Sequence, residues 1–401
     1  MFSLLDIATT VEMNPIGSSM KVSVGLFAGA GGIELGLASS GYEPSLLCDI
    51  DESAGAVLSH RFAGATVGSD VFDVHHLPQT SVLAAGFPCQ DLSQAGRRTG
   101  ISGPKSGIVS HVFSLLKDAE FHPEWLLFEN VSFMLSLDQG SAMSYLVSQL
   151  ERQGYSWAYR VVDSRAFGLP QRRKRVYLLA SKTQDPRVIH MQEAGDRAEP
   201  KWTGGPAGFY WTEGNTGLGW APGAIPTLKG GSGLGIPSPP AIWFPGDTIG
   251  TPDIRDAERL QGFPEGWTEA PSEANAKRRG ARWRLVGNAV SVPAASWIGE
   301  LISSPYDGSA PSGTRMQPSD RWPSAAWGTE GERFAVDRSP WPVEYELPCI
   351  SDFLNYPLKP LSAKATKGFY SRLSRSTLKR PGQFDEDLRT HIDRMERLNR
   401  S

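Results

Sequence analysis

The chain has 401 residues, which is enough for about two to three domains and at least one substantial hydrophobic core. Hydrophobic residues make up 40% and charged residues 21%, a composition typical of globular proteins and not of disordered chains. The net charge of −3 argues against a module that only binds nucleic acid, although an enzyme can confine its positive charge to one cleft.

Cysteine usage and hydropathy exclude further classes. Cys48, Cys89 and Cys349 are too few for a disulfide framework and lack the spacing of metal ligands. The sequence contains no run of about 18 apolar residues, and residues 1–20, expected to form an N-terminal arm, lack the charge pattern of a signal peptide. We therefore expect a cytoplasmic protein without a metal and without a membrane span.

The first predicted elements suggest a nucleotide-type pocket. Lys21–Phe27 is predicted to be a strand that runs into a glycine-rich turn and a helix at Ile33–Ala38. The turn has the pattern Gly-x-Gly-Gly, which differs from the dinucleotide fingerprint. A second strand, Pro44–Asp49, ends in an acid about twenty residues later, where a carboxylate can bind ribose hydroxyls. The pattern favours an adenosine-containing cofactor, and the alternative is a tight turn with a solvated aspartate.

Strands and helices alternate through residue 181, which predicts an α/β fold with a parallel sheet and helices on both faces. Asp70 is expected at the end of a third strand. In chain order, these further elements are strands at Ala65–Val71, Ser81–Ala85, Glu124–Val131, Ser156–Val162 and Val176–Ala180, helices at Ile108–Asp118 and Ala142–Arg152, and a basic turn at Gly168–Arg175.

Cys89 follows the Ser81–Ala85 strand, at the edge where parallel sheets bind ligands. Its thiolate would be a good nucleophile if nearby cations lowered its pKa. A buried structural cysteine is the simpler interpretation of a lone thiol. We prefer the functional one because the strand ends carrying Glu129 and the basic residues Arg173 and Arg175 are expected at the same edge. A thiol, a carboxyl and arginines suit addition to an electron-poor heteroaromatic ring.

The composition changes after Lys182. Residues 201–250 contain 13 Gly and 7 Pro with interleaved aromatics, which predicts either a loop-rich recognition surface or a small β-subdomain with an aromatic core. A helix is predicted at Val290–Ile302. Residues 304–342 are expected to be a linker or loosely ordered arm. Residues 359–380 contain seven basic and no acidic side chains, consistent with a solvated face or with phosphate contacts.

Six short sequence blocks stand out in chain order. They are Leu26–Gly32 (LFAGAGG), Gly86–Gln90 (GFPCQ), Phe128–Val131 (FENV), Pro170–Arg175 (PQRRKR), Arg259–Pro264 (RLQGFP) and Gly287–Val290 (GNAV). Together they resemble the bacterial and phage-type DNA (cytosine-5)-methyltransferase family, over roughly residues 20–303. Two positions outside the blocks depart from the family pattern, because Gly25 stands where the family often has Asp and Asp49 where it usually has Glu.

The resemblance implies a Rossmann-like S-adenosylmethionine-dependent methyltransferase domain with a small loop-rich target-recognition domain. It divides the chain into a catalytic and cofactor-binding domain at 21–181, a target-recognition domain at 182–252, a segment returning to the catalytic domain at 253–303 and an extension at 304–401. The residues it implies for binding S-adenosyl-L-methionine are Phe27, Gly29, Gly31, Gly32, Asp49, Ile50, Asp70, Pro88, Asn288, Ala289 and Val290.

The same resemblance implies the catalytic roles. Cys89 would add to carbon 6 of a flipped-out cytosine, Glu129 would bond to ring nitrogen 3, and Arg175 would hold the ring carbonyl before methyl transfer to carbon 5. Arg173 is a further catalytic candidate. Double-stranded DNA would be contacted by a loop that closes over it and by the recognition domain. The implied DNA-binding residues are Gln90, Ser93, Arg97, Arg98, Gln171, Thr227 and Leu228.

Two alternatives remain beside this interpretation. One is a tRNA cytosine-5 methyltransferase with the same chemistry, and the other is a DNA-binding regulator with vestigial catalysis. The Gly- and Pro-rich segment favours a major-groove reader of DNA. We expect a monomer, because one catalytic unit contains every needed group. A cognate restriction endonuclease that acts separately is a possible partner.

Overall fold

The structure is a computed structural model that describes residues 21–87, 107–215, 217–231, 237–270, 280–304 and 306–400. The described chain forms two compact units. The first contains the described residues of Met1–Asp163, Lys174–Asp196 and Val290–Val343, and the second those of Ser164–Arg173, Arg197–Ala289 and Glu344–Ser401. Each unit therefore collects distant stretches of chain, and neither coincides with one predicted domain.

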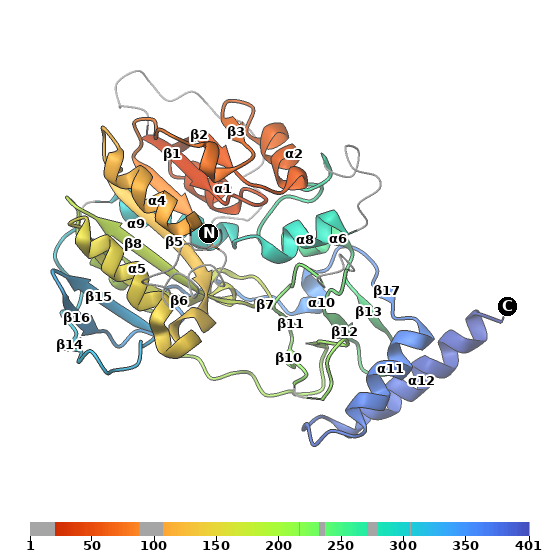
Figure 1. The fold of residues 1–401 in the computed structure, drawn as a ribbon. Coiled ribbons are helices and arrows are strands. Elements are labelled where there is room, and N and C mark those ends of the chain that lie inside the picture. The colour runs from red at the N-terminus through yellow and green to blue at the C-terminus, as the bar shows by residue number, and fades with distance from the viewer. Residues whose placement is uncertain are drawn as a thin grey trace. The chain divides into compact units, whose positions relative to one another are not determined.

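A ten-stranded sheet forms the centre of the first unit, in the order β14-β16-β15-β6-β8-β5-β4-β1-β2-β3 (Figure 1). Five strands pair in parallel, and their order, β3-β2-β1-β4-β5, reverses between β1 and β4. Open α/β sheets bind ligands at the carboxyl ends of the strands flanking such a reversal. These strands, all predicted from sequence, are β1 Lys21–Leu26, β2 Tyr42–Cys48, β3 Thr66–Gly68, β4 Val82–Ala85 and β5 Trp125–Val131.

The next two strands are antiparallel, so the sheet is mixed where the sequence predicted a parallel one. β8 (Lys174–Ser181) pairs antiparallel with both β5 and β6 (Ser156–Asp163). The short connection between β6 and β8 permits this, because parallel neighbours need a crossover of a dozen or more residues. The pairing sets Arg175 opposite Val131, so the beginning of β8 lies at the carboxyl end of β5.

Residues 304–342 also differ from the predicted linker, because three strands in this stretch extend the sheet past β6. They are β14 Thr314–Arg315, β15 Ala325–Thr329 and β16 Glu332–Ala335. Ala326 pairs with Tyr159 of β6 and is fully buried. The Trp322 ring lies edge-on to those of Trp157 and Tyr159. The Ser, Pro and Gly residues that suggested a linker serve as turns between short strands.

Helices cover both faces of the sheet in the first unit. α4 (Gly107–Asp118) and α5 (Ser141–Arg152) pack with Val24 and Leu26 of β1, whereas α1 (Gly32–Ala38) faces Gly25 between them. α9 (Val292–Ser303) packs against α1. α2 spans Glu52–Arg61. The apolar stretch Ala281–Ser303 has the length and composition of a membrane span. However, 78% of its most apolar 18-residue part is buried in the protein, as in a core helix.

The second unit is built on a five-stranded sheet covered by the helical hairpin of α11 and α12 (Figure 1). Phe209 and Trp243 of the sheet are fully buried against Phe369 and Phe384 of the hairpin, so part of the predicted aromatic recognition surface is core. Its elements are β7 Gln171–Arg172, β9 Ala207–Phe209, β10 Ala221–Pro222, β11 Ile225–Pro226, β12 Ala241–Trp243, β13 Ile249–Thr251, β17 Lys359–Pro360, α6 Ile254–Arg259, α8 Ala281–Asn288, α10 Ile350–Phe353, α11 Ala363–Leu373 and α12 Gly382–Leu398.

The hairpin is expected to be essential to the second unit. Phe384→Ala removes a fully buried ring and should lower the free energy of unfolding by about 3–5 kcal/mol. Urea unfolding followed by tryptophan fluorescence measures the change. The control is Leu398→Ala on the same helix, which is 62% exposed and should change the value by less than about 0.5 kcal/mol. Equal effects of the two substitutions would contradict a core role for the hairpin.

Candidate active site

The glycine-rich turn after β1 is held in an unusual backbone conformation. Phe27, which is not a glycine, has φ 60°, and Gly29 and Gly31 have φ 56° and 79°. Backbone strain at a non-glycine residue persists where the surrounding structure enforces it, often at ligand sites. A Cβ on Gly31 would collide with the ring of Phe62, whereas a Cβ on Gly29 would meet no atom within 4 Å. Gly31 is therefore needed for packing, and Gly29 leaves open space for a ligand close to the backbone.

Asp49 ties this turn to the end of β2. Its Oδ2 accepts a hydrogen bond of 2.8 Å from the Gly29 N–H, and its Oδ1 accepts one of 2.8 Å from the Asp51 N–H. The next side chain, Ile50, is 80% exposed. Asp70 follows β3 and accepts a hydrogen bond from the Phe72 N–H. An open glycine backbone, two carboxylates and an exposed apolar side chain at one sheet edge suit a nucleoside with ribose hydroxyls.

Glu34 is a buried carboxyl under this edge that the sequence did not single out. It lies in the first turn of α1 and is 1% exposed, and a Cβ on Gly25 would collide with its Oε1. Its Oε2 accepts no hydrogen bond from the described residues. Burial, with a smaller contribution from Asp49, raises the pKa of Glu34 to about 7. The space above Gly25 is thus filled by a carboxyl from the helix.

Glu129 and Arg175 form an ion pair at the carboxyl end of β5. Nε of Arg175 lies 3.1 Å from Oε1 of Glu129, and the two side chains are only 12% and 10% exposed. Oε2 of Glu129 would lie 4.0 Å from a Cβ on Gly86. Gly86 follows β4 and precedes Cys89 by three residues. The structure therefore brings a carboxylate and a guanidinium from two predicted site positions to the chain that leads into Cys89.

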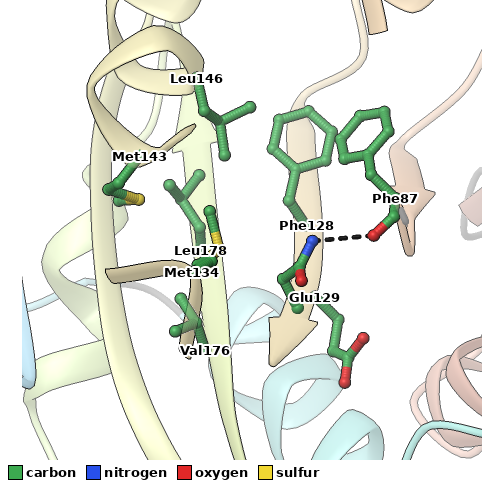
Figure 2. Close-up of a pocket in the computed structure, with 9 residues that line it drawn as sticks. Phe87, Phe128, Glu129, Met134, Met143, Leu146, Val176 and Leu178 are labelled. Carbon is green, nitrogen blue, oxygen red and sulfur yellow. Dashed lines mark hydrogen bonds between the residues drawn. The ribbon is translucent and has the colours of Figure 1, made fainter. Parts of the chain in front are cut away.

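Asn130, to which the sequence assigned no role, fixes the backbone just before Pro88. Its Nδ2 donates a hydrogen bond of 2.8 Å to the Phe87 carbonyl, and its Oδ1 accepts one from the Val131 N–H. Figure 2 shows this bond and the Glu129 carboxylate pointing away from the apolar side chains beside it. Those side chains are Phe87, Phe128, Met134, Met143, Leu146, Val176 and Leu178. The position of Asn130 next to Glu129 in the FENV block is the sequence feature that could have indicated a role for it.

Six predicted site residues lie outside the described residues. They include the proposed nucleophile and most of the loop expected to close over DNA, and they are Pro88, Cys89, Gln90, Ser93, Arg97 and Arg98.

The remaining predicted residues belong to the second unit, except Val290 and the buried Gly32 at the start of α1, which belong to the first. Arg173 is 1% exposed and donates hydrogen bonds to the carbonyls of Leu228, Gly287 and Ala289. A buried guanidinium must satisfy its donors within the protein, and Arg173 donates to carbonyls of two separate segments.

Gln171 and Leu228 differ from their predicted contacts with DNA. Gln171 is fully buried, donates to the Leu260 carbonyl and accepts from the Leu228 N–H, while the Leu228 side chain is 1% exposed. Thr227 is partly buried and donates to the Arg172 carbonyl. Asn288 is exposed, and its Oδ1 lies close to Gly230. Apart from Thr227 and Asn288, the predicted residues of this unit are buried.

Comparisons with known proteins agree with this arrangement. A family model of C-5 cytosine-specific DNA methylases matches residues 22–203. The chain is 51% identical over 370 residues to the type II methyltransferase M2.BsuMI of Bacillus subtilis (strain 168), across 89% of this chain and 94% of that protein. It is 28% identical over 309 residues to M.NlaX of Neisseria lactamica, across 70% and 95%. The structure of the S. pombe Dnmt2 methyltransferase shares the fold, with a TM-score of 0.52, 17% identity and coverage of 70% and 98%.

The buried carboxyl of Glu34 should make stability depend on pH. The unfolded side chain ionises near its ordinary pKa of 4.5, whereas the folded one keeps its proton up to about 7. The folded state therefore binds more protons in this window, and its stability falls as pH rises from 4.5 to 7. Glu34→Gln removes the titration, so its stability relative to wild type should rise by about 2–3 kcal/mol between pH 5 and pH 8. Urea unfolding at both pH values measures this, and a constant difference would contradict it.

Proposed function

The chain belongs to the C-5 cytosine-specific DNA methylases, and from that premise we propose that Cys89, Glu129 and Arg175 catalyse its reaction. The reaction is the transfer of the methyl group of S-adenosyl-L-methionine to carbon 5 of cytosine in DNA. The family, the enzyme class and the cofactor expected from the sequence are thereby confirmed. We propose the roles of the individual residues, recognition of a specific sequence by the second unit, and the partners.

One observation supports the residue roles above the others. Glu129 and Arg175 are far apart in the sequence, yet their side chains pair at 3.1 Å beside Gly86, the residue that begins the GFPCQ block. Both are almost buried, and charged groups are costly to bury unless they are paired. A pair of this kind at the edge where the sheet binds ligands is the arrangement expected of groups that act on a substrate.

The chemistry follows from these groups. The Cys89 thiolate adds to carbon 6 of a cytosine taken out of the helix, because neither ring face is accessible in the stack. In its protonated form, Glu129 donates a hydrogen bond to ring nitrogen 3 and so stabilises the added electron pair, and Arg175 holds Glu129 and the ring carbonyl. Carbon 5 becomes electron-rich, and bound S-adenosyl-L-methionine would supply it with an electrophilic methyl group. Carbon 5 then loses its proton to solvent, the electron pair of that bond forms the double bond between carbons 5 and 6, and the Cys89 thiolate leaves carbon 6.

The residues at the ends of β1, β2 and β3 fit the adenosine part of the cofactor. We propose that the backbone at Gly29 leaves room for it, that Asp49 binds the ribose hydroxyls, and that Ile50 covers the adenine. Each Asp49 oxygen already accepts one backbone N–H, so the carboxylate is held in place before any ligand binds. Such preorganisation lowers the entropy cost of binding.

The type II names of the relatives support a role in sequence-specific modification. We propose that the enzyme protects double-stranded DNA from a separate cognate endonuclease, that it acts as a monomer in the cytoplasm, and that the second unit reads the sequence. The DNA methylase model and the type II relatives favour DNA over tRNA as the substrate.

The proposed activity is tested by incubating the protein with labelled S-adenosyl-L-methionine and duplex DNA, followed by cytosine methylation mapping at base resolution. We expect methyl groups at one recurring short sequence. If tRNA in a parallel reaction became labelled while the DNA did not, the result would instead support the tRNA cytosine-5 methyltransferase. A parallel reaction without protein is the control.

The nucleophile is tested separately. Cys89→Ser should lower the methylation rate by about 10³-fold or more, because the hydroxyl is a much weaker nucleophile than a thiolate. DNA affinity, measured by fluorescence anisotropy, should stay close to that of wild type. Cys349→Ser is the matched control, since Cys349 lies in the second unit, and it should retain full activity. Methylation by Cys89→Ser at the wild-type rate would refute the assignment.

A further inference from the structure

The basic run of residues 359–380 is not a uniform charged surface. Arg372 is used inside the second unit, where it donates hydrogen bonds to the carbonyls of Trp211 and Glu213. Lys367 and Arg380 form ion pairs with Glu396 and Asp385. These three cations are therefore occupied by protein groups.

Two further cations are exposed on the solvent side of α11 and of the turn that follows it. Lys364 lies in α11 and Arg375 lies two residues past its end, and within the described part of the chain neither has a carboxylate partner. α11 contains no acidic residue, and its opposite face is buried in the core through Phe369 and Leu373. Arg375 is anchored to the end of the helix, because it donates hydrogen bonds to the carbonyl and the hydroxyl of Ser371.

A chain of contacts joins α11 to the Thr227-Leu228 element. Arg372 donates a hydrogen bond to the backbone carbonyl of Glu213, and the side-chain carboxylate of Glu213 forms an ion pair with Lys229. Lys229 also lies over the Tyr210 ring, 3.7 Å from its centroid, and the Tyr210 hydroxyl donates to the Thr227 carbonyl. Within the second unit, the C-terminal end of α11 and the proposed recognition element therefore form one interconnected structure.

We propose that the solvent face of α11 and the turn after it, with Lys364, Arg375 and the following Lys379, bind the phosphate backbone of DNA beside the recognition sequence. The inference rests on the proposed function of the second unit. Lys364 and Arg375 are eleven residues apart, which at helical rise is about 16 Å and about five base-pair steps of DNA. The exposed Ser371 hydroxyl, which accepts a hydrogen bond from Arg375, adds a donor of the kind that contacts phosphates.

The test is the salt dependence of DNA affinity. A variant with Lys364→Gln and Arg375→Gln is compared with wild type by fluorescence anisotropy, from about 50 to 200 mM KCl, on a duplex with the mapped sequence and on one without it. Two lost phosphate contacts should reduce the slope of log K against log salt by about 1.8. Both duplexes should be affected equally, because phosphate contacts carry no sequence information.

The matched control removes the same charges elsewhere. Lys117→Gln with Arg152→Gln changes one exposed lysine and one exposed arginine at the C-terminal ends of α4 and α5, and it should leave the slope unchanged. Thermal unfolding midpoints check that all variants are folded. An unchanged slope for the α11 variant, or an equal reduction in the control, would overturn the proposal. Binding does not depend on methyl transfer, so a reduced slope without any DNA methylation would refute the proposed function and not this surface.

Discussion

The antiparallel pairing of β8 with β5 is the constraint on which the site depends. Had β8 run parallel to β5, its first residues would lie at the opposite edge of the sheet, and Arg175 could not reach Glu129. The reversed direction sets Lys174 and Arg175 beside the carboxyl ends of the parallel strands. The same edge carries Asp49, Asp70 and the chain that leads toward Cys89. The direction of one strand thus brings Arg175 to the edge that carries the other proposed groups of this unit.

Buried polar groups around this edge divide into two kinds. Asn130 and Arg173 donate hydrogen bonds to backbone carbonyls and so fix the segments to which those carbonyls belong. Glu34 differs, because one of its oxygens lacks a hydrogen bond within the described residues, and burial favours its protonated form. Burial penalises the ionised carboxyl, and the nearby Asp49 carboxylate adds a smaller penalty of the same sign.

Residues 304–401, about a quarter of the chain, are divided between the two units and packed in both. β14, β15 and β16 extend the main sheet, while α11 and α12 complete the core around Trp243. Charge alone left the basic run of residues 359–380 open between a solvated face and phosphate contacts. Packing distinguishes its cations, because a cation on the buried side of a helix must find a partner and one on the other side remains in water.

The sequence by itself determined the local elements and the family of the chain. Apolar runs predicted β1, β4 and β5, and the GFPCQ and FENV blocks made Cys89 and Glu129 the proposed site residues, because strand periodicity and reactive residue types are local properties. Tertiary structure decided the direction of β8, the presence of strands in residues 304–342 and the burial of Gln171, Arg173 and Leu228. Those outcomes depend on which distant segments meet and which polar groups are buried between them, and a local pattern carries neither kind of information.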